Sequence, residues 1–384
     1  MSLNLVADRY SICNTDCTET SKSGSLRVLH VDNIIGETSA SLNEHVLPMV
    51  DEYNISLCTF FPSPVNVPSS INLYAGEGTI ISFYRNLWAC LRANEYDVVH
   101  IHAPHVGLFA LIFILFWRIK LLKSTIYTVH CSYQFFTRLH RLLLIFLFLS
   151  FRRIVHCSWS SYDSFPLLYR LLGGSRRTVI PNGVDVSRVD RAISDSVGQR
   201  LHSIVNDKLR VLSVGRLIPV KNLFTLMEVV ANTKLPNITL EFLGDGELRD
   251  SLCSSINQSD LSDQIVLRGM IPRDQVYHEL ANADLYISTS LGEGLPIAVM
   301  EAMCCRCPVI LSDIPPHREL AELVDFIPLI DPKDSARFSY EIQRILNMSQ
   351  VERAKLGEKG RQLVEKHFSL KAMHEGYAAL YTYV

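Results

Sequence analysis

Residues 288–313, STSLGEGLPIAVMEAMCCRCPVILSD, constrain the fold more than any other part of this 384-residue chain. The pattern predicts the end of a strand, a glycine-rich turn, a helix and a second strand. Gly292 and Gly294 permit backbone conformations that other residues resist. Pro296 suits the first turn of a helix, because its missing N–H costs no hydrogen bond there. We therefore expect a helix that begins near Leu295.

The turn before this helix is suited to hold a phosphate. Free N–H groups and the positive end of the helix dipole face the turn, so Gly294 and Leu295 can bind an anion through their backbone. Two carboxylates bracket this position, because Glu293 lies in the turn and Glu301 lies within the helix. Either glutamate alone could be a solvated surface charge. The spacing Glu-x7-Glu around a Gly-Leu-Pro turn instead suits a molecule in which sugars flank phosphates.

This segment resembles the Glu-x7-Glu signature of retaining glycosyltransferases of the family-4 type, which have the GT-B fold. Three further strings match the same family in the same order: Pro-Asn-Gly-Val-Asp at 181–185, Gly-Arg with Lys-Asn at 215–222, and Gly-Asp-Gly at 244–246. The resemblance implies an α/β protein of two Rossmann-like, doubly wound domains that face each other across a cleft. It also implies sugar transfer from a nucleoside diphosphate with retention of configuration.

The chain length favours two domains, and short apolar runs that alternate with helical segments predict a parallel sheet in each. We expect a polar extension over residues 1–25, an acceptor domain over 26–183 and a donor domain over 184–366. Residues 33–53 should form a loop and a helix that ends near Tyr53. The resemblance implies that residues 367–384 form a helix that packs back on the first domain.

The charge of the chain is small overall and uneven along the sequence. A net charge of −2 gives no general attraction for nucleic acid, so we expect no nucleic-acid partner. Residues 101–178 nevertheless hold ten Lys and Arg and the single acidic residue Asp163. Such asymmetry predicts one basic face.

Two apolar segments, 108–117 and 142–149, lie within this basic stretch. Each is shorter than the roughly 20 residues that a membrane-spanning helix needs. We interpret the first as a buried helix. The second has arginines on both sides and predicts a helix at an anionic membrane surface. The N-terminus lacks the pattern of a secretory signal, so we expect a cytoplasmic protein, peripheral on the inner face of the membrane.

Cysteine and histidine are residue types that commonly bind zinc. The ten cysteines show no paired Cys-x-x-Cys spacing of the zinc type, and their one cluster is Cys304, Cys305 and Cys307. We expect the cysteines to be core residues in a reducing compartment. His100, His102 and His105 form the string His-x-His-x-x-His at the end of a predicted strand. Because neighbouring strand residues point to opposite faces, we expect His100 and the loop beyond His102 not to converge, and we predict no metal site.

A glycine and two cations, Arg216 and Lys221, precede a second predicted helix that begins near Leu223. A guanidinium binds phosphate oxygens bidentately and an ammonium acts as a mobile point charge, so this pair suits a diphosphate. The resemblance assigns both cations to the donor diphosphate, Glu293 and His130 to the donor sugar, and Glu301 to the ribose. We thus expect catalytic roles for Arg216, Lys221, Glu293 and His130. Further donor contacts are implied at Gly36, Gly244, Met270, Gly294 and Leu295.

The resemblance further implies a reaction that needs neither a metal nor another cofactor, and the chain contains no Asp-x-Asp metal clamp. The expected donor is UDP-linked, and the expected acceptor is a glycan or a lipid-linked glycan of the cell envelope. Two alternatives stay open. A non-catalytic partner that binds a nucleotide sugar or a glycan is favoured by the single glycine, Gly36, where the family usually has two. A GT-B sugar-nucleotide epimerase would require an additional pair of acid and base carboxylates. The sugar, the base, the acceptor and the oligomeric state are left open.

Overall fold

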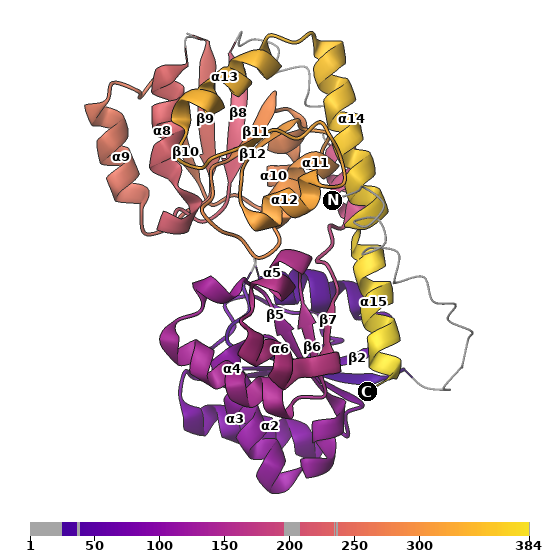
Figure 1. Cartoon of the computed structure of the whole chain (residues 1–384). Helices are drawn as coiled ribbons and strands as arrows, with labels where there is room; N and C mark the ends of the chain where they lie inside the picture. Colours follow the sequence, from indigo (N-terminus) through magenta and orange to yellow (C-terminus); the bar gives the residue numbers. More distant parts are fainter. Residues whose placement is uncertain (1–24, 37–38, 196–207, 234, 236, 384) are drawn as a thin grey trace. The chain divides into compact units, whose positions relative to one another are not determined.

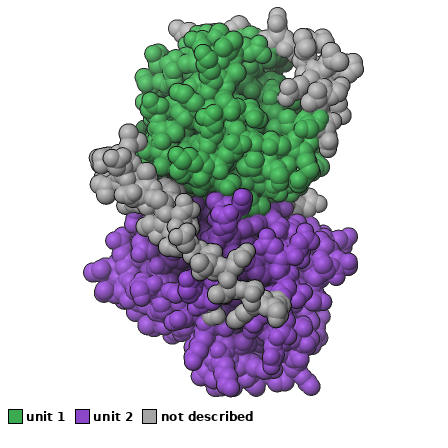
Figure 2. All heavy atoms as spheres, turned by 90° about the vertical axis from the view of Figure 1, so that its right-hand side faces the viewer, with its two compact units in different colours: residues 1–11, 183–370 green, residues 12–182, 371–384 purple. Residues whose placement is uncertain are grey.

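The structure, a computed structural model, describes residues 25–383 apart from 37–38, 196–207, 234 and 236. The expected N-terminal extension lies almost entirely outside the described residues. The described chain divides into two compact units, which Figure 2 shows in different colours. The N-terminal unit consists of residues up to 182 together with 371–383, and the C-terminal unit consists of residues 183–370.

The N-terminal unit is built on a seven-stranded parallel sheet with the strand order β3-β2-β1-β4-β5-β6-β7. Figure 1 labels β2, β5, β6 and β7 of this sheet. Every residue of β4 and β5 is buried, as expected for central strands covered on both faces. The sequence predicts no strand at β3. Its residues lie at the sheet edge and are exposed or only partly buried, so they do not form the apolar run that marks a buried strand. The strands are β1 (Arg27–Asp32), β2 (Asn54–Thr59), β3 (Asn72–Ala75), β4 (Val98–Ile101), β5 (Thr125–Val129), β6 (Arg153–His156) and β7 (Arg177–Val179).

Helices cover this sheet, and the last of them comes from the C-terminal end of the chain. The helix expected to end near Tyr53 is instead a short π-helix followed by a 3-10 turn at Pro48. α15 hydrogen-bonds to the sheet, because Tyr381 Oη lies 2.8 Å from His100 Nδ1 and Tyr377 Oη lies 3.0 Å from Thr128 Oγ1. The main helices are η1 (Ser41–Val46), η2 (Leu47–Met49), α2 (Ile80–Ala93), α3 (Pro104–Trp117), α4 (Arg138–Ser150), α5 (Trp159–Ser164), α6 (Leu167–Gly173) and α15 (Leu370–Thr382).

The C-terminal unit is built on a six-stranded parallel sheet with the order β10-β9-β8-β11-β12-β13. Its core is made of aliphatic side chains from the inner strands and the covering helices, with Phe242 and Phe338 as the largest members. The strands are β8 (Leu209–Val214), β9 (Ile238–Leu243), β10 (Ile265–Gly269), β11 (Leu285–Ser288), β12 (Val309–Ser312) and β13 (Leu329–Ile330).

Helix α11 follows the glycine-rich turn and begins two residues later than expected. Its N-cap is Pro296, which leaves Leu295 in the turn. The helices of this unit are α7 (Val186–Asp195), α8 (Leu223–Asn232), α9 (Arg249–Gln258), α10 (Arg273–Ala281), α11 (Ile297–Cys304), α12 (Pro315–Ala321), α13 (Ser335–Leu346) and α14 (Gln350–His367). Among the described helices, none combines the length and the hydropathy needed to cross a membrane.

Each sheet has a switch point, where the chain changes the direction in which it adds strands. The switch points lie between β1 and β4 in the first sheet and between β8 and β11 in the second. Ligands of doubly wound sheets bind at the carboxyl ends of the strands at such points. The loops after β8 and β11 carry the cations and the Glu-x7-Glu segment, and the ends of β4 and β5 carry His102 and His130.

Candidate active site

Lys221 and Glu293 form a partly buried ion pair at the switch point of the C-terminal unit. Lys221 Nζ lies 2.7 Å from Glu293 Oε1, and Ser290 Oγ donates a 2.6 Å hydrogen bond to the same oxygen. Burial alone would raise the pKa of Glu293, but the charge and the hydrogen bond of Lys221, with the hydrogen bond of Ser290, outweigh it and lower the pKa. The carboxylate is therefore ionised at neutral pH and can accept hydrogen bonds from hydroxyl groups.

Arg216 lies on the loop after β8 and borders the same small hollow as Lys221. Gly215, Ser288 and Ser290 also line this hollow. Arg216 is exposed, and its guanidinium has no hydrogen bond or ion pair with a described residue. The hollow therefore combines a guanidinium that is available to an anion with an ammonium that a neighbouring carboxylate fixes in place.

The glycines near the hollow permit a close approach of two loops. Gly244 has a φ of +143°, and a Cβ atom there would lie 2.0 Å from the carbonyl oxygen of Gly215. Any other residue at 244 would push the two loops apart. The structure thus gives Gly244 a packing role beside its expected contact with the nucleotide. Gly36 in the N-terminal unit differs, because among the described residues a Cβ atom there would meet only Ser39 Oγ, at 3.8 Å.

Glu301 is held rigidly on α11 by two residues of α10. Arg273 donates to Glu301 Oε1 through Nε at 2.8 Å and Nη2 at 2.7 Å, and Tyr277 Oη donates to the same oxygen at 2.9 Å. The glutamate side chain is buried. Neither Arg273 nor Tyr277 was singled out from the sequence, because both lie on a helix whose packing against α11 only the fold defines. Met270, directly after β10, is exposed and accessible to a ligand.

His130 follows β5 in the N-terminal unit and hydrogen-bonds to another histidine. Its Nε2 atom lies 3.0 Å from His102 Nδ1. Burial lowers the pKa of His130 to about 4, so the imidazole is neutral at pH 7. A neutral imidazole can donate or accept one hydrogen bond on each side of the ring, which suits contact with a sugar hydroxyl.

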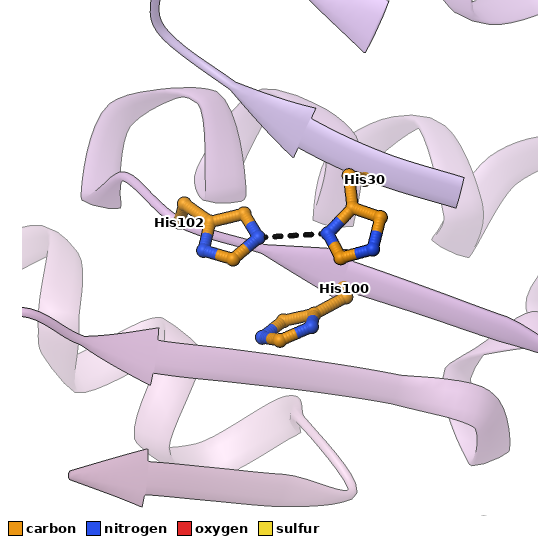
Figure 3. Close-up of side chains that lie close together, drawn as sticks. All are labelled: His30, His100 and His102. Atoms are coloured by element: carbon orange, nitrogen blue, oxygen red, sulfur yellow. Dashed lines mark hydrogen bonds between the residues drawn. The ribbon is translucent and has the colours of Figure 1, made fainter. Parts of the chain in front are cut away.

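The sequence predicts no metal site at the end of β4, yet His100 and His102 converge. His102 directly follows β4 and is two residues from His100, so their side chains share a face, and their ring centroids lie 4.3 Å apart. His105, in the loop beyond, instead hydrogen-bonds to Asn33. The register of β1 against β4 places His30 opposite His100. Figure 3 shows the rings of His30, His100 and His102 gathered together. His30 and His45 were missed in the sequence because only strand pairing and the fold of η1 bring them to this cluster.

His317 lies beneath the turn that carries Glu293. Its side chain is fully buried, and Nδ1 donates to the carbonyl oxygen of Ser312 at 2.8 Å. Nε2 therefore carries no proton, and no described residue hydrogen-bonds to it. Burial lowers the pKa of His317 to about 4, although the charge of Glu293 opposes this effect.

We expect His317 to make the fold less stable at acidic pH. Its folded pKa lies below the unfolded value near 6.5, so the unfolded chain takes up the proton first and stability falls as pH drops below 6.5. At pH 5.0 this effect amounts to about 2 kcal/mol. His317→Asn keeps a donor for Ser312 and removes the titration. Urea denaturation measures how much the free energy of unfolding falls between pH 7.5 and pH 5.0. This fall should be about 2 kcal/mol smaller in the variant than in the wild type, and an equal fall in both would contradict the assignment.

Two protein-family models match this chain, each over a different part of it. Residues 199–363 match the family model of Glycosyl transferases group 1, and residues 53–188 match that of Glycosyltransferase Family 4. The chain is 26% identical over 282 residues to UDP-Gal:alpha-D-GlcNAc-diphosphoundecaprenol alpha-1,3-galactosyltransferase of Escherichia coli, covering 70% of this chain and 69% of that protein.

A second relative is the putative teichuronic acid biosynthesis glycosyltransferase TuaC of Bacillus subtilis, 27% identical over 212 residues. That match covers 54% of this chain and 51% of TuaC, so the chain spans about half of TuaC's length. The crystal structure of HepE from Anabaena in complex with UDP and glucose superposes with a TM-score of 0.75 at 18% identity, covering 94% of this chain and 100% of that one. The two family models together span most of the chain and the architecture agrees with them, so this chain belongs to the glycosyltransferases and has the GT-B fold.

Proposed function

We propose that this chain is a retaining glycosyltransferase that moves a sugar from a UDP-sugar to a glycan or lipid-linked acceptor without a metal ion at the diphosphate. The observation that carries the proposal is the group formed by Arg216, Lys221 and Glu293 at the switch point of the C-terminal unit. The names of the relatives support the substrate classes. The E. coli protein is named for UDP-Gal and a diphosphoundecaprenol-linked acceptor, and the HepE structure contains UDP and glucose.

The charge at this site matches the charge that develops on a leaving nucleoside diphosphate. Arg216 can bind phosphate oxygens through its free guanidinium, and Lys221 adds a second positive charge nearby. The free N–H groups at the start of α11 add a partial positive charge. Preorganised charges of this kind stabilise a transition state in which negative charge builds up on the diphosphate.

The carboxylates would then position the two sugars of the donor. Glu293 is ionised and fixed by Lys221, so it can accept hydrogen bonds from hydroxyls of the transferred sugar. Glu301 is held by Arg273 and Tyr277 and would accept from the ribose. His130, which is partly buried, would contact the transferred sugar.

In the proposed reaction, the acceptor hydroxyl attacks the anomeric carbon from the face that the diphosphate leaves. The bond from the anomeric carbon to the diphosphate oxygen breaks, and the bond to the acceptor oxygen forms on the same face. The acceptor proton passes to the departing phosphate oxygen. Donor and product therefore share the same anomeric configuration.

A thermal-shift panel of nucleoside diphosphates and their sugars, with and without magnesium, tests the donor site. We expect UDP to raise the Tm without magnesium, since a ligand at a hundred times its Kd adds about 2.7 kcal/mol. Glu301→Gln should make this rise in Tm smaller. A carboxylate accepts hydrogen bonds through two oxygens, whereas an amide accepts through one, so the variant can accept from only one of the two ribose hydroxyls as well as the wild type does. Glu358→Gln, on an exposed ion pair with Arg306, is the matched control.

Two outcomes of these assays would favour the alternatives. No shift with any nucleotide would favour a partner that binds glycans without turnover. Release of the sugar without an acceptor would favour an epimerase that hydrolyses its donor.

The retaining mechanism has its own test. Acceptor-dependent release of UDP, with an NMR spectrum of the product that shows inversion of the anomeric centre, would refute retention.

The proposed acceptor class is supported by an exposed apolar surface on the N-terminal unit. α4 packs against α3 and α6, as Figure 1 shows. The segment 142–149 is helical as expected, and its helix exposes four apolar residues spaced three or four apart, which places them on one face: Leu139, Leu142, Phe146 and Leu149. The segment 108–117, expected to be buried, leaves its last residues Leu115, Phe116 and Trp117 exposed.

Basic residues accompany this apolar face. Arg138 and Arg152 flank α4, and Lys120 and Lys123 lie after α3; all four are exposed. An apolar helical face with nearby cations binds an anionic lipid surface, and each cation near the surface contributes about 1 kcal/mol. We therefore infer that this face holds the enzyme at a membrane that contains the lipid-linked acceptor.

Liposome sedimentation tests this inference. Wild-type protein should sediment with anionic vesicles at low salt and less so at high salt. The double variant Leu142→Ser/Phe146→Ser should bind at least tenfold more weakly, because two exposed apolar side chains no longer insert. The control Tyr340→Ser/Val351→Ser replaces exposed apolar residues of the C-terminal unit and should bind like wild type. Absence of binding at low salt would refute the membrane association.

A further inference from the structure

Two buried histidines and one partly buried histidine of the N-terminal unit converge from separate elements. His45 lies on the π-helix η1, His102 follows β4 and His130 follows β5. One ring nitrogen from each lies within 4.8 Å of one nitrogen from each of the others. His102 Nδ1 and His130 Nε2 are only 3.0 Å apart. A tetrahedral zinc ion with Zn–N bonds of about 2.0–2.1 Å holds its ligand atoms roughly 3.3 Å apart, so little movement is needed to admit an ion.

His45 has no hydrogen-bond partner for its ring. Its side chain is fully buried, and neither Nδ1 nor Nε2 bonds to any described residue. The ring instead stands edge-on to His102, with centroids 5.0 Å apart, and to Tyr377, at 4.9 Å. Buried polar groups in folded proteins are nearly always bonded, so an unbonded imidazole aimed at two others requires a reason. A bound metal ion would supply the missing partner.

The state of the three rings suits metal ligands. Burial keeps all three imidazoles neutral, and the neutral ring is the form that binds a metal. His102 also has a partner on the opposite side of its ring, because its Nε2 lies 2.9 Å from His30 Nδ1 (Figure 3). Such a contact, from the nitrogen that does not bind the metal, orients the ring in known metal sites.

A second histidine triad in the same cluster is less suited to an ion. It consists of His30, His100 and His102. Both nitrogens of His100 are already bonded, Nδ1 to Tyr381 Oη at 2.8 Å and Nε2 to Thr128 Oγ1 at 2.7 Å. Metal binding there would break a buried hydrogen bond of His100. Binding in the first triad would replace only the hydrogen bond between His102 and His130, and His45 would lose none.

We propose that His45, His102 and His130 form a binding site for a transition-metal ion of the Zn²⁺ type. Three neutral nitrogen ligands select Zn²⁺, Co²⁺, Ni²⁺ or Cu²⁺ over Mg²⁺ and Ca²⁺, which prefer oxygen. Three protein ligands leave a fourth position open to water or another small ligand. The site belongs to the N-terminal unit and shares no residue with the group proposed to bind the diphosphate. The proposal that sugar transfer needs no metal ion at the diphosphate is therefore unchanged.

Metal binding can be measured without any sugar donor or acceptor. Protein stripped with a chelator and dialysed against Zn²⁺ should retain one ion per chain at micromolar concentration, whereas Mg²⁺ should not be retained. Co²⁺ in the same site should give the intense visible absorption of a tetrahedral complex without the near-ultraviolet band of a thiolate ligand. The lack of that band excludes binding at an exposed thiol such as Cys253. Failure of the wild type to retain Zn²⁺ or Co²⁺ would overturn the proposal.

Variants separate this site from other histidines. His45→Phe should lower the affinity for Zn²⁺ at least 100-fold while it fills the space beside Tyr377, and His130→Ala should do the same. His105→Ala is the matched control, because its Nε2 bonds to Asn33 Oδ1 at 2.7 Å and it lies outside both histidine triads. Full affinity in His45→Phe and His130→Ala, or a comparable loss in His105→Ala, would refute the assignment.

His130 links this site to the proposed reaction, and the two ideas can fail separately. If His130 contacts the donor sugar, excess Zn²⁺ should inhibit transfer, and a chelator should restore it. Stoichiometric Zn²⁺ binding without any effect on transfer would retain the metal site and refute the role of His130. Loss of nucleotide binding in the thermal-shift panel would refute the donor site and leave the metal measurement unchanged.

Discussion

Arg216→Ala is expected to lower kcat/KM for sugar transfer by about 10²- to 10³-fold and to leave the Tm unchanged. The guanidinium is exposed and has no bond to a described residue, so its removal breaks no contact that stabilises the described fold. In the reaction it would bind the diphosphate as negative charge develops there. Loss of one preorganised donor at such a position typically costs two to three orders of magnitude in rate.

Steady-state assays of UDP release, together with thermal denaturation of each variant, would measure both effects. Arg306→Ala is the control, because Arg306 forms an exposed ion pair with Glu358 whose side chains are 50% and 48% accessible. Such pairs contribute little, so this variant should keep its activity and most of its stability. Equal activity in Arg216→Ala and Arg306→Ala would remove Arg216 from the donor site.

Lys221→Ala should lower both activity and stability, because it leaves the Glu293 carboxylate buried without a cation. The side chain of Glu293 is 14% accessible and that of Lys221 is 22% accessible. Removing one partner of a fully buried ion pair costs about 3–5 kcal/mol, so we expect a smaller loss of stability for this partly buried pair. The loss of stability should be larger at pH 8 than at pH 5. Without Lys221, burial raises the pKa of Glu293, and a proton then neutralises the carboxylate at acidic pH.

The double variant Lys221→Ala/Glu293→Gln separates stability from catalysis. The neutral amide needs no counter-charge, so urea denaturation should show recovery of most of the lost stability. Transfer should remain at least 10²-fold below wild type, because both the cation at the diphosphate and the carboxylate at the sugar are gone. Recovery of activity together with stability would show that the pair acts only on the fold.

Most of the strands, β3 excepted, could be predicted from the sequence alone because each depends on local pattern. Short apolar runs indicate strands buried on both faces, and glycine and proline mark where they end. The α/β class, the GT-B fold and the glycosyltransferase family are confirmed. The assignment of Arg216 and Lys221 to the diphosphate also rests on local pattern, because both follow one strand within a few residues, and it stays a prediction.

The tertiary structure decided every contact between residues that are distant in the sequence. Lys221 and Glu293 are 72 residues apart, and only the pairing of β8 with β11 brings their loops together. His45 comes within 4.8 Å of two strand-end histidines because η1 folds over the sheet. The local sequence determines which residues can form strands and which side chains carry charge. Register and burial determine which of them meet, because both are set by the packing of the whole unit.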